Sequence, residues 1–118
     1  MTGFKIVTQK NGLLFDISQK HCFDVNVRDC INSYIYDEKG ISTSTNKYFV
    51  LDFYAHTCDD PILLELEFLH SDIISHVSLS DKEPVMLIDR CRITYLYFLK
   101  ESHDGKYTID YHRQNQFL

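Results

Sequence analysis

The order of apolar and polar residues in the first half of the chain predicts strands in three segments. Residues 4–8 and 13–17 flank Asn11-Gly12, a dipeptide that readily takes the positive φ values of a tight turn, so we expect a hairpin. Residues 48–55 alternate clearly and predict a half-buried strand. One face of that strand would carry Phe49, Leu51, Phe53 and Ala55, and the other would carry Tyr48, Asp52 and Tyr54.

Two segments show helical spacing. Residues 25–38 predict a helix because its apolar residues fall along one helical face; a competing strand pattern uses alternate residues from Phe23 to Val27. Residues 62–77 fit both a strand and a helix. The preceding Asp60-Pro61 is typical of a helix start, so helix is the favoured interpretation and strand stays open.

The C-terminal third predicts mainly strand. Residues 85–99 are rich in β-branched and aromatic side chains, and residues 106–112 follow a turn at 101–105. We expect residues 113–118 to fray unless Phe117 is docked. The whole pattern predicts one α+β domain over residues 1–118, with an antiparallel sheet of about five strands and one or two helices packed on one face.

Charge and composition bear on the kind of partner. The 118 residues include 17 Asp and Glu against 12 Lys and Arg, for a net charge of −5, with eight Tyr, eight Phe and no Trp. Negative charge disfavours nucleic acid and anionic membranes, whereas Tyr and Phe favour protein interfaces. The predicted partner-binding surface consists of Tyr48, Asp52, Tyr54, Asp59, Asp60, Glu65 and Glu67. The first residues lack the long hydrophobic region of a secretory signal, so we expect a cytoplasmic protein whose four cysteines are free thiols.

Candidate chemistry is sparse. His56, Cys58 and Asp59 form the densest group of potential metal ligands, but their spacing matches no recognised metal motif, so we expect a polar turn and assign no metal, cofactor or catalytic residue. A small metal-binding protein or enzyme using this loop is the alternative hypothesis. Arg90 and Arg92, beside Tyr95 and Tyr97, are compatible with nucleic-acid binding, which the net charge disfavours.

In length and in its acidic clusters Asp37-Glu38, Asp59-Asp60 and Glu65-x-Glu67, the chain resembles bacterial toxin-immunity proteins, including those of contact-dependent growth inhibition systems. Phage-encoded inhibitors of host proteins have the same profile, so a phage or viral accessory protein is a further alternative. The resemblance implies a protein without an active site of its own. Such a protein would neutralise a toxin, for example a basic nuclease, by occluding its active site with acidic and aromatic side chains.

Overall fold

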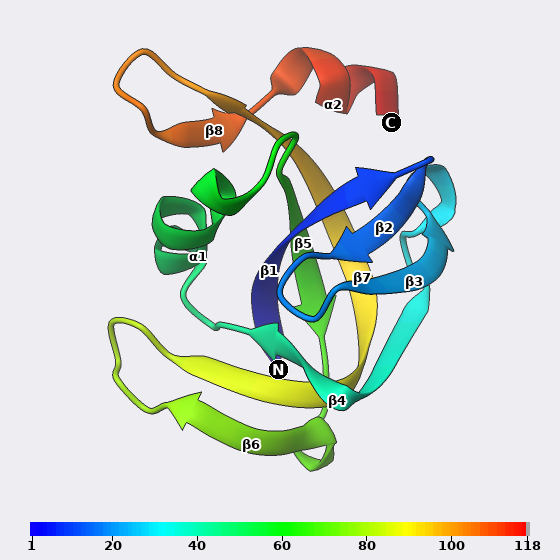
Figure 1. Ribbon diagram of the computed structural model, residues 1–118, viewed down its shortest axis with the longest axis vertical. Coiled ribbons are helices and arrows are strands. Elements are labelled where there is room, and N and C mark those ends of the chain that lie inside the picture. The colour runs from blue at the N-terminus through cyan, green and yellow to red at the C-terminus, as the bar shows by residue number, and fades with distance from the viewer. Residues whose placement is uncertain (118) are drawn as a thin grey trace.

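One long strand organises the fold. The computed structural model describes residues 1–117, in which eight antiparallel strands form a single strongly curved sheet with two α-helices (Figure 1). The strands are β1 (Thr2–Lys10), β2 (Leu13–Asp16), β3 (His21–Asn26), β4 (Tyr34–Thr43), β5 (Ile62–Glu67), β6 (Ile73–Ser78), β7 (Val85–Glu101) and β8 (Tyr107–Ile109). The helices are α1 (Lys47–Tyr54) and α2 (Tyr111–Phe117), with short 3₁₀ turns η1 (Val27–Asp29), η2 (Ala55–Thr57) and η3 (His70–Asp72).

The strand order is β3-β2-β1-β5-β7-β4, and β6 and β8 also pair with β7. The 17 residues of β7 allow its first part to pair with β4 and β6, and its later part to pair with β5 and β8. The curvature brings β4 back to β1, where Phe4 and Ser44 exchange two backbone hydrogen bonds of 2.7 and 3.1 Å. The sheet therefore closes on itself at this seam.

The core has two parts, one on each face of the sheet. The inner face encloses the larger cluster, which includes Val7, Leu64 and Ile88. The outer face of β1 and β5 forms a second cluster with α1, in which Ile6 and Leu63 meet Val50. Residues 6 and 7, like residues 63 and 64, divide between the two clusters because neighbouring side chains of a strand point to opposite faces. The central strands are thus buried on both sides.

The α+β class and the hairpin are confirmed, and the sheet has eight strands where about five were expected. Asn11 and Gly12 have φ of 54° and 80°, as the tight turn requires. Residues 85–99 lie within β7 as predicted, whereas the strand expected at 106–112 is limited to β8 and gives way to α2. Phe117 docks edge-on against the Phe98 ring, with ring centroids 5.4 Å apart. Fraying of residues 113–118 was expected unless Phe117 docked, and residues 113–117 belong to α2; residue 118 lies outside the described residues.

The helix predicted at 25–38 is wrong, because this segment forms the end of β3, η1, a turn and the first half of β4. Val27, Cys30 and Ile35 do enter one core cluster, but the backbone takes a positive φ of 70° at Asn32. Asn32 N–H then donates to the Ile93 carbonyl at 2.7 Å. Pairing with β7 therefore decides the conformation against the helical periodicity.

The strand predicted at 48–55 is also wrong, because this segment forms α1 and η2. The Asn46 side chain accepts hydrogen bonds from the backbone N–H groups of Tyr48 and Phe49 at 3.1 and 3.2 Å, which caps the helix start. In residues 62–77 the favoured helix is wrong and the strand alternative is correct, since β5 and β6 both pair with β7. Among residues 1–117, no helix has the length and apolar character needed to cross a membrane.

Candidate functional site

Helix α1 carries three of the predicted partner-binding residues. Tyr48 is 75% exposed, Asp52 lies one turn later, and Tyr54 ends the helix. Phe53, which sequence reasoning placed on the buried face of a strand, is 61% exposed and packs against Phe49 with ring centroids 5.3 Å apart. The opposite side of the helix buries Val50 against the sheet. Helix α1 therefore has apolar side chains on both its buried and its exposed sides.

The predicted acidic residues do not gather in one patch. Asp59 and Asp60 lie in the loop before β5, while Glu65 and Glu67 share the outer face of that strand. Five residue steps, roughly 17 Å, separate the two ends of β5. The seven predicted residues are thus distributed over α1, one loop and one strand.

Two of these carboxylates are neutralised within the chain. Asp60 accepts a hydrogen bond from Arg113 in an ion pair of 2.6 Å and another from Gln9 at 3.0 Å. Although partial burial opposes the shift, these donors hold the pKa of Asp60 below its usual value. Glu67 pairs with Arg92 at 3.2 Å. Asp52 and Asp59 form no ion pair with any residue of the described chain, so their charge faces solvent.

The His56–Cys58–Asp59 loop does not assemble a metal centre in the structure. Within residues 1–117 no group of three or more His, Cys, Asp or Glu side chains is placed to hold a metal ion. His56 instead packs edge-on against Tyr107, with ring centroids 4.9 Å apart. Burial, reinforced by the charge of Asp59, raises the pKa of the Cys58 thiol to about 11, which disfavours its nucleophilic thiolate form. All four cysteines are free, as expected.

The two arginines considered for nucleic-acid binding are engaged elsewhere in the fold. The Arg90 guanidinium lies 4.6 Å from the centroid of the Tyr34 ring. Arg92 donates to Asn32 at 2.6 Å in addition to pairing with Glu67. Tyr95 and Tyr97 pack against each other, with centroids 4.6 Å apart. The arginines thus contact β4 and β5 and stabilise the joins between these strands and β7.

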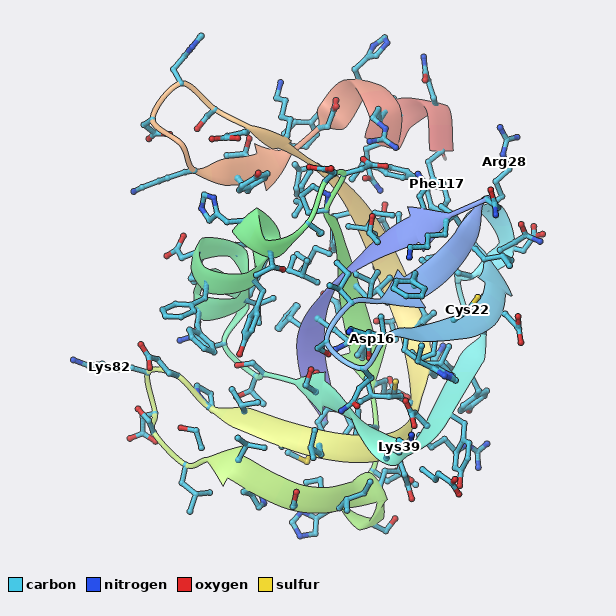
Figure 2. All side chains as sticks on the ribbon, viewed as in Figure 1. Asp16, Cys22, Arg28, Lys39, Lys82 and Phe117 are labelled. Carbon is cyan, nitrogen blue, oxygen red and sulfur yellow. The ribbon has the colours of Figure 1, made fainter. Side chains whose placement is uncertain are left out.

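The structure also contains a buried polar cluster that sequence reasoning missed. Lys5 lies in β1 on the same face as Val7, so its side chain enters the interior, where it is 4% exposed. Its ammonium group pairs with Asp16 Oδ1 at 3.3 Å and donates to Ser42 Oγ at 2.7 Å, to the Ser42 carbonyl at 3.0 Å and to Ser18 Oγ at 3.3 Å. Figure 2 places Asp16 near the middle of the molecule, whereas Arg28 and Lys82 lie at its edge.

Asp16 is fully buried and asymmetrically bonded. Its Oδ1 accepts hydrogen bonds from the hydroxyl and the backbone N–H of Ser18, at 2.7 and 3.1 Å. Its Oδ2 is buried without a hydrogen-bond partner among the described residues. Burial lowers the pKa of Lys5 from its usual 10.5, and the nearby charge of Asp16 opposes that shift. One signal in the sequence could have revealed this cluster. Lys5 stands between apolar neighbours in its strand, two residues before Val7 and therefore on the same face, which is buried.

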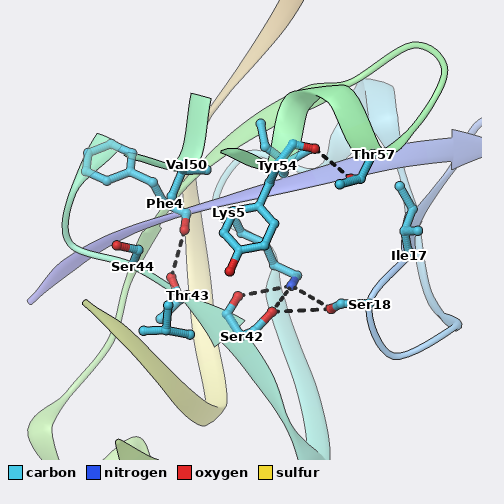
Figure 3. Close-up of a pocket in the computed structure, with 12 residues that line it drawn as sticks. Phe4, Lys5, Ile17, Ser18, Ser42, Thr43, Ser44, Val50, Tyr54 and Thr57 are labelled. Atoms are coloured by element: carbon cyan, nitrogen blue, oxygen red, sulfur yellow. Dashed lines mark hydrogen bonds between the residues drawn. The ribbon is translucent and has the colours of Figure 1, made fainter. Parts of the chain in front are cut away.

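The cluster lies at one side of a pocket of about 200 Å³ at the seam between β1 and β4 (Figure 3). Helix α1 covers the pocket with Val50 and Tyr54, and Figure 3 shows Lys5 extending beneath Tyr54 toward Ser42 and Ser18. The lining residues are Phe4, Lys5, Ile6, Ile17, Ser18, Ser42, Thr43, Ser44, Val50, Tyr54, Thr57 and Val85. Of these lining residues in the described chain, Lys5 alone carries a charge, so the pocket is an apolar space with hydroxyl groups and one amine.

Comparison of the chain with protein-family models, with curated proteins and with solved structures gives no significant match.

Proposed function

We propose that this is a non-enzymatic protein-binding module whose binding surface is centred on the exposed side of α1. The observation that carries the proposal is the exposure of Tyr48 and Phe53 on a helix whose other side is already buried. A helix that is apolar on both sides is normally covered on both. Aromatic side chains of this kind contribute much of the binding energy at protein interfaces.

The proposed partner is a protein with a basic cleft, such as a cognate toxin that acts as a nuclease, and the chain would be its immunity protein. Asp52 lies on the same helix as the exposed aromatic residues, and Asp59 follows shortly after it; neither is ion-paired among residues 1–117. The net charge of −5 supports attraction to a basic partner and rapid association. Binding over the cleft would occlude the active site of the toxin, and the natural compartment for this encounter is the cytoplasm.

The test is a binding measurement with the purified product of the neighbouring gene, first screened for toxicity alone and rescue on co-expression. Tyr48→Ala and Phe53→Ala should each weaken binding tenfold or more, which corresponds to about 1.4 kcal/mol, and leave the thermal midpoint unchanged. Tyr111→Ala is the matched control, because Tyr111 is similarly exposed, at 68%, but lies on α2.

A complex whose affinity is unchanged by both α1 substitutions would contradict the proposed surface. A neighbouring gene product that neither harms cells alone nor forms a complex would contradict the immunity function. Sedimentation of the protein alone is the third measurement: a dimer that the α1 substitutions dissociate would show that a second copy, and not a toxin, covers this helix.

A further inference from the structure

The pocket beneath α1 brings an amine and an apolar space together. Nζ of Lys5 bonds to Ser18 and Ser42, and both of these hydroxyl-bearing residues also line the pocket. The remaining walls include Phe4, Ile17 and the Tyr54 ring. A surface lysine would be surrounded by water, whereas this amine lies at the boundary between a buried ion pair and an apolar cavity.

The volume of the pocket sets the size of a ligand. A cavity of about 200 Å³ is smaller than the usual site for a drug-sized molecule. An engineered apolar cavity of roughly 150 Å³ is sufficient to bind benzene. The pocket therefore has room for one aromatic ring or a short aliphatic chain bearing a small polar group.

The charge balance favours a neutral polar group. Lys5 is already paired with Asp16, and the carboxylate of Asp37 also acts on it from within the fold. A carboxylate ligand would add another buried negative charge to this group, at a high desolvation cost. A carbonyl group adds no charge and accepts a hydrogen bond from an amine or hydroxyl.

We infer that the pocket is a binding site for a small aldehyde or ketone with an apolar body, and that Lys5 captures this ligand covalently as an imine. This activity is separate from the proposed protein binding, because it uses the inner side of α1. Lysines that react with carbonyl compounds are activated by removal from water, which increases the share of the neutral amine. The buried position of Lys5 provides this condition.

Asp16 can balance the protons of the reaction. It first takes a proton from the Lys5 ammonium, and the amine lone pair then forms a C–N bond to the carbonyl carbon. The carbonyl π electrons move to oxygen, which takes the Ser18 hydroxyl proton, and Ser18 recovers that proton from Asp16, to which it is hydrogen-bonded at 2.7 Å; Ser18 lines the pocket and Asp16 does not. The nitrogen then returns one proton to Asp16, giving a carbinolamine. Asp16, again through the Ser18 hydroxyl, then protonates the carbinolamine hydroxyl, which leaves as water while the nitrogen lone pair forms a protonated C=N bond and the Asp16 carboxylate is regenerated. The Asp16 carboxylate contacts the Lys5 ammonium through Oδ1 at 3.3 Å, and its Oδ2 has no hydrogen-bond partner among residues 1–117.

The experiment uses the full chain with benzaldehyde at pH 8 and sodium cyanoborohydride, which reduces an imine to a stable benzylamine. Peptide mapping by mass spectrometry should place one benzyl group on Lys5, with at least tenfold less label on the exposed lysines Lys39 and Lys82. Excess toluene, which has the same ring and no carbonyl, should suppress labelling of Lys5 and leave the surface lysines unaffected.

Two outcomes would overturn the inference. One is label confined to surface lysines. The other is label on Lys5 that toluene does not suppress, since this would show reaction without occupation of the pocket. Lys5→Met should lose the specific label while Lys82→Met retains it. If Lys5→Met does not fold, the site map and the toluene competition on the wild-type protein still decide the question.

Discussion

Replacing Lys5 with methionine should destabilise the protein strongly, because it leaves the fully buried Asp16 without its counter-ion. The carboxylate would retain only the Ser18 hydroxyl and N–H on Oδ1, with Oδ2 still unpartnered. Removing one partner of a buried ion pair typically costs about 3–5 kcal/mol. An unfolding entropy of roughly 2.1 cal/mol/K per residue over the 118 residues converts this loss to a fall of about 12–20 °C in Tm.

The double variant Lys5→Met/Asp16→Asn separates the charge from the packing. It removes both charges from the interior, so we expect it to recover at least half of the free energy of unfolding lost in Lys5→Met. Urea denaturation followed by circular dichroism measures all three proteins. A loss below about 1 kcal/mol in Lys5→Met, or no recovery in the double variant, would refute the description of Lys5 and Asp16 as a buried charged pair.

The same pair predicts a dependence on pH. Burial lowers the pKa of Lys5 in the folded state below the usual 10.5, so the unfolded chain binds more protons between the folded pKa and 10.5. The stability of wild type relative to Lys5→Met should therefore rise with pH through that window. Tyrosines and cysteines that titrate in both proteins largely cancel in this difference. A difference that falls with pH would contradict the lowered pKa.

Three further outcomes test other parts of the fold. Gly40→Ala should lower the free energy of unfolding, measured by urea titration, by about 1–3 kcal/mol, because φ is 103° and a Cβ would lie 2.8 Å from Leu87 Cβ. Gly105→Ala should lower it by less, because φ is 79° there but the nearest atom to the added Cβ is 3.9 Å away. Gln114→Leu should lower the free energy of unfolding by about 2–4 kcal/mol and increase amide hydrogen exchange in α2. The reason is that it leaves the buried Phe98 N–H and Leu96 carbonyl of β7 without their hydrogen-bond partner. Cys58 should react with iodoacetamide at pH 7 at least 100-fold more slowly than free cysteine. A thiol pKa of about 11, compared with about 8.5 for free cysteine, leaves roughly 300-fold less of the reactive thiolate. A reaction rate equal to that of free cysteine would contradict the raised pKa.

The candidate site could be predicted only in part. Acidic and aromatic composition directed attention to Tyr48, Asp52 and Tyr54, and the structure places Tyr48 and Asp52 on the exposed side of one helix. The Arg113–Asp60 pair could not be anticipated, because it joins residues 53 apart in sequence. Lys5 was overlooked because lysine is almost never fully buried without a partner, and its partner Asp16 belongs to another strand.

The sequence by itself determined the elements whose signals lie within a few residues. Asn11-Gly12 defines the first hairpin because few other dipeptides take two positive φ values at low cost. The long apolar run of β7 could only be strand, since its alternation persists over most of its length. The aromatic and acidic composition of residues 48–54 is likewise read directly from the sequence, but their helical conformation and the exposure of Phe53 are not.

Tertiary structure decided the conformation of those segments whose apolar residues fit both the helical and the strand periodicity. The apolar residues of 62–77 fit both a helical and a strand periodicity, and β7 selects strands because it provides backbone donors and acceptors for β5 and β6. The opposite holds for residues 48–55, which find no strand to pair with because β1 already has β2 and β5 as neighbours. This segment therefore forms its backbone hydrogen bonds internally, as a helix, and packs on the outer face of the sheet. The pocket and its buried amine exist only because sheet closure brings Lys5, Asp16 and Ser42 together from three strands.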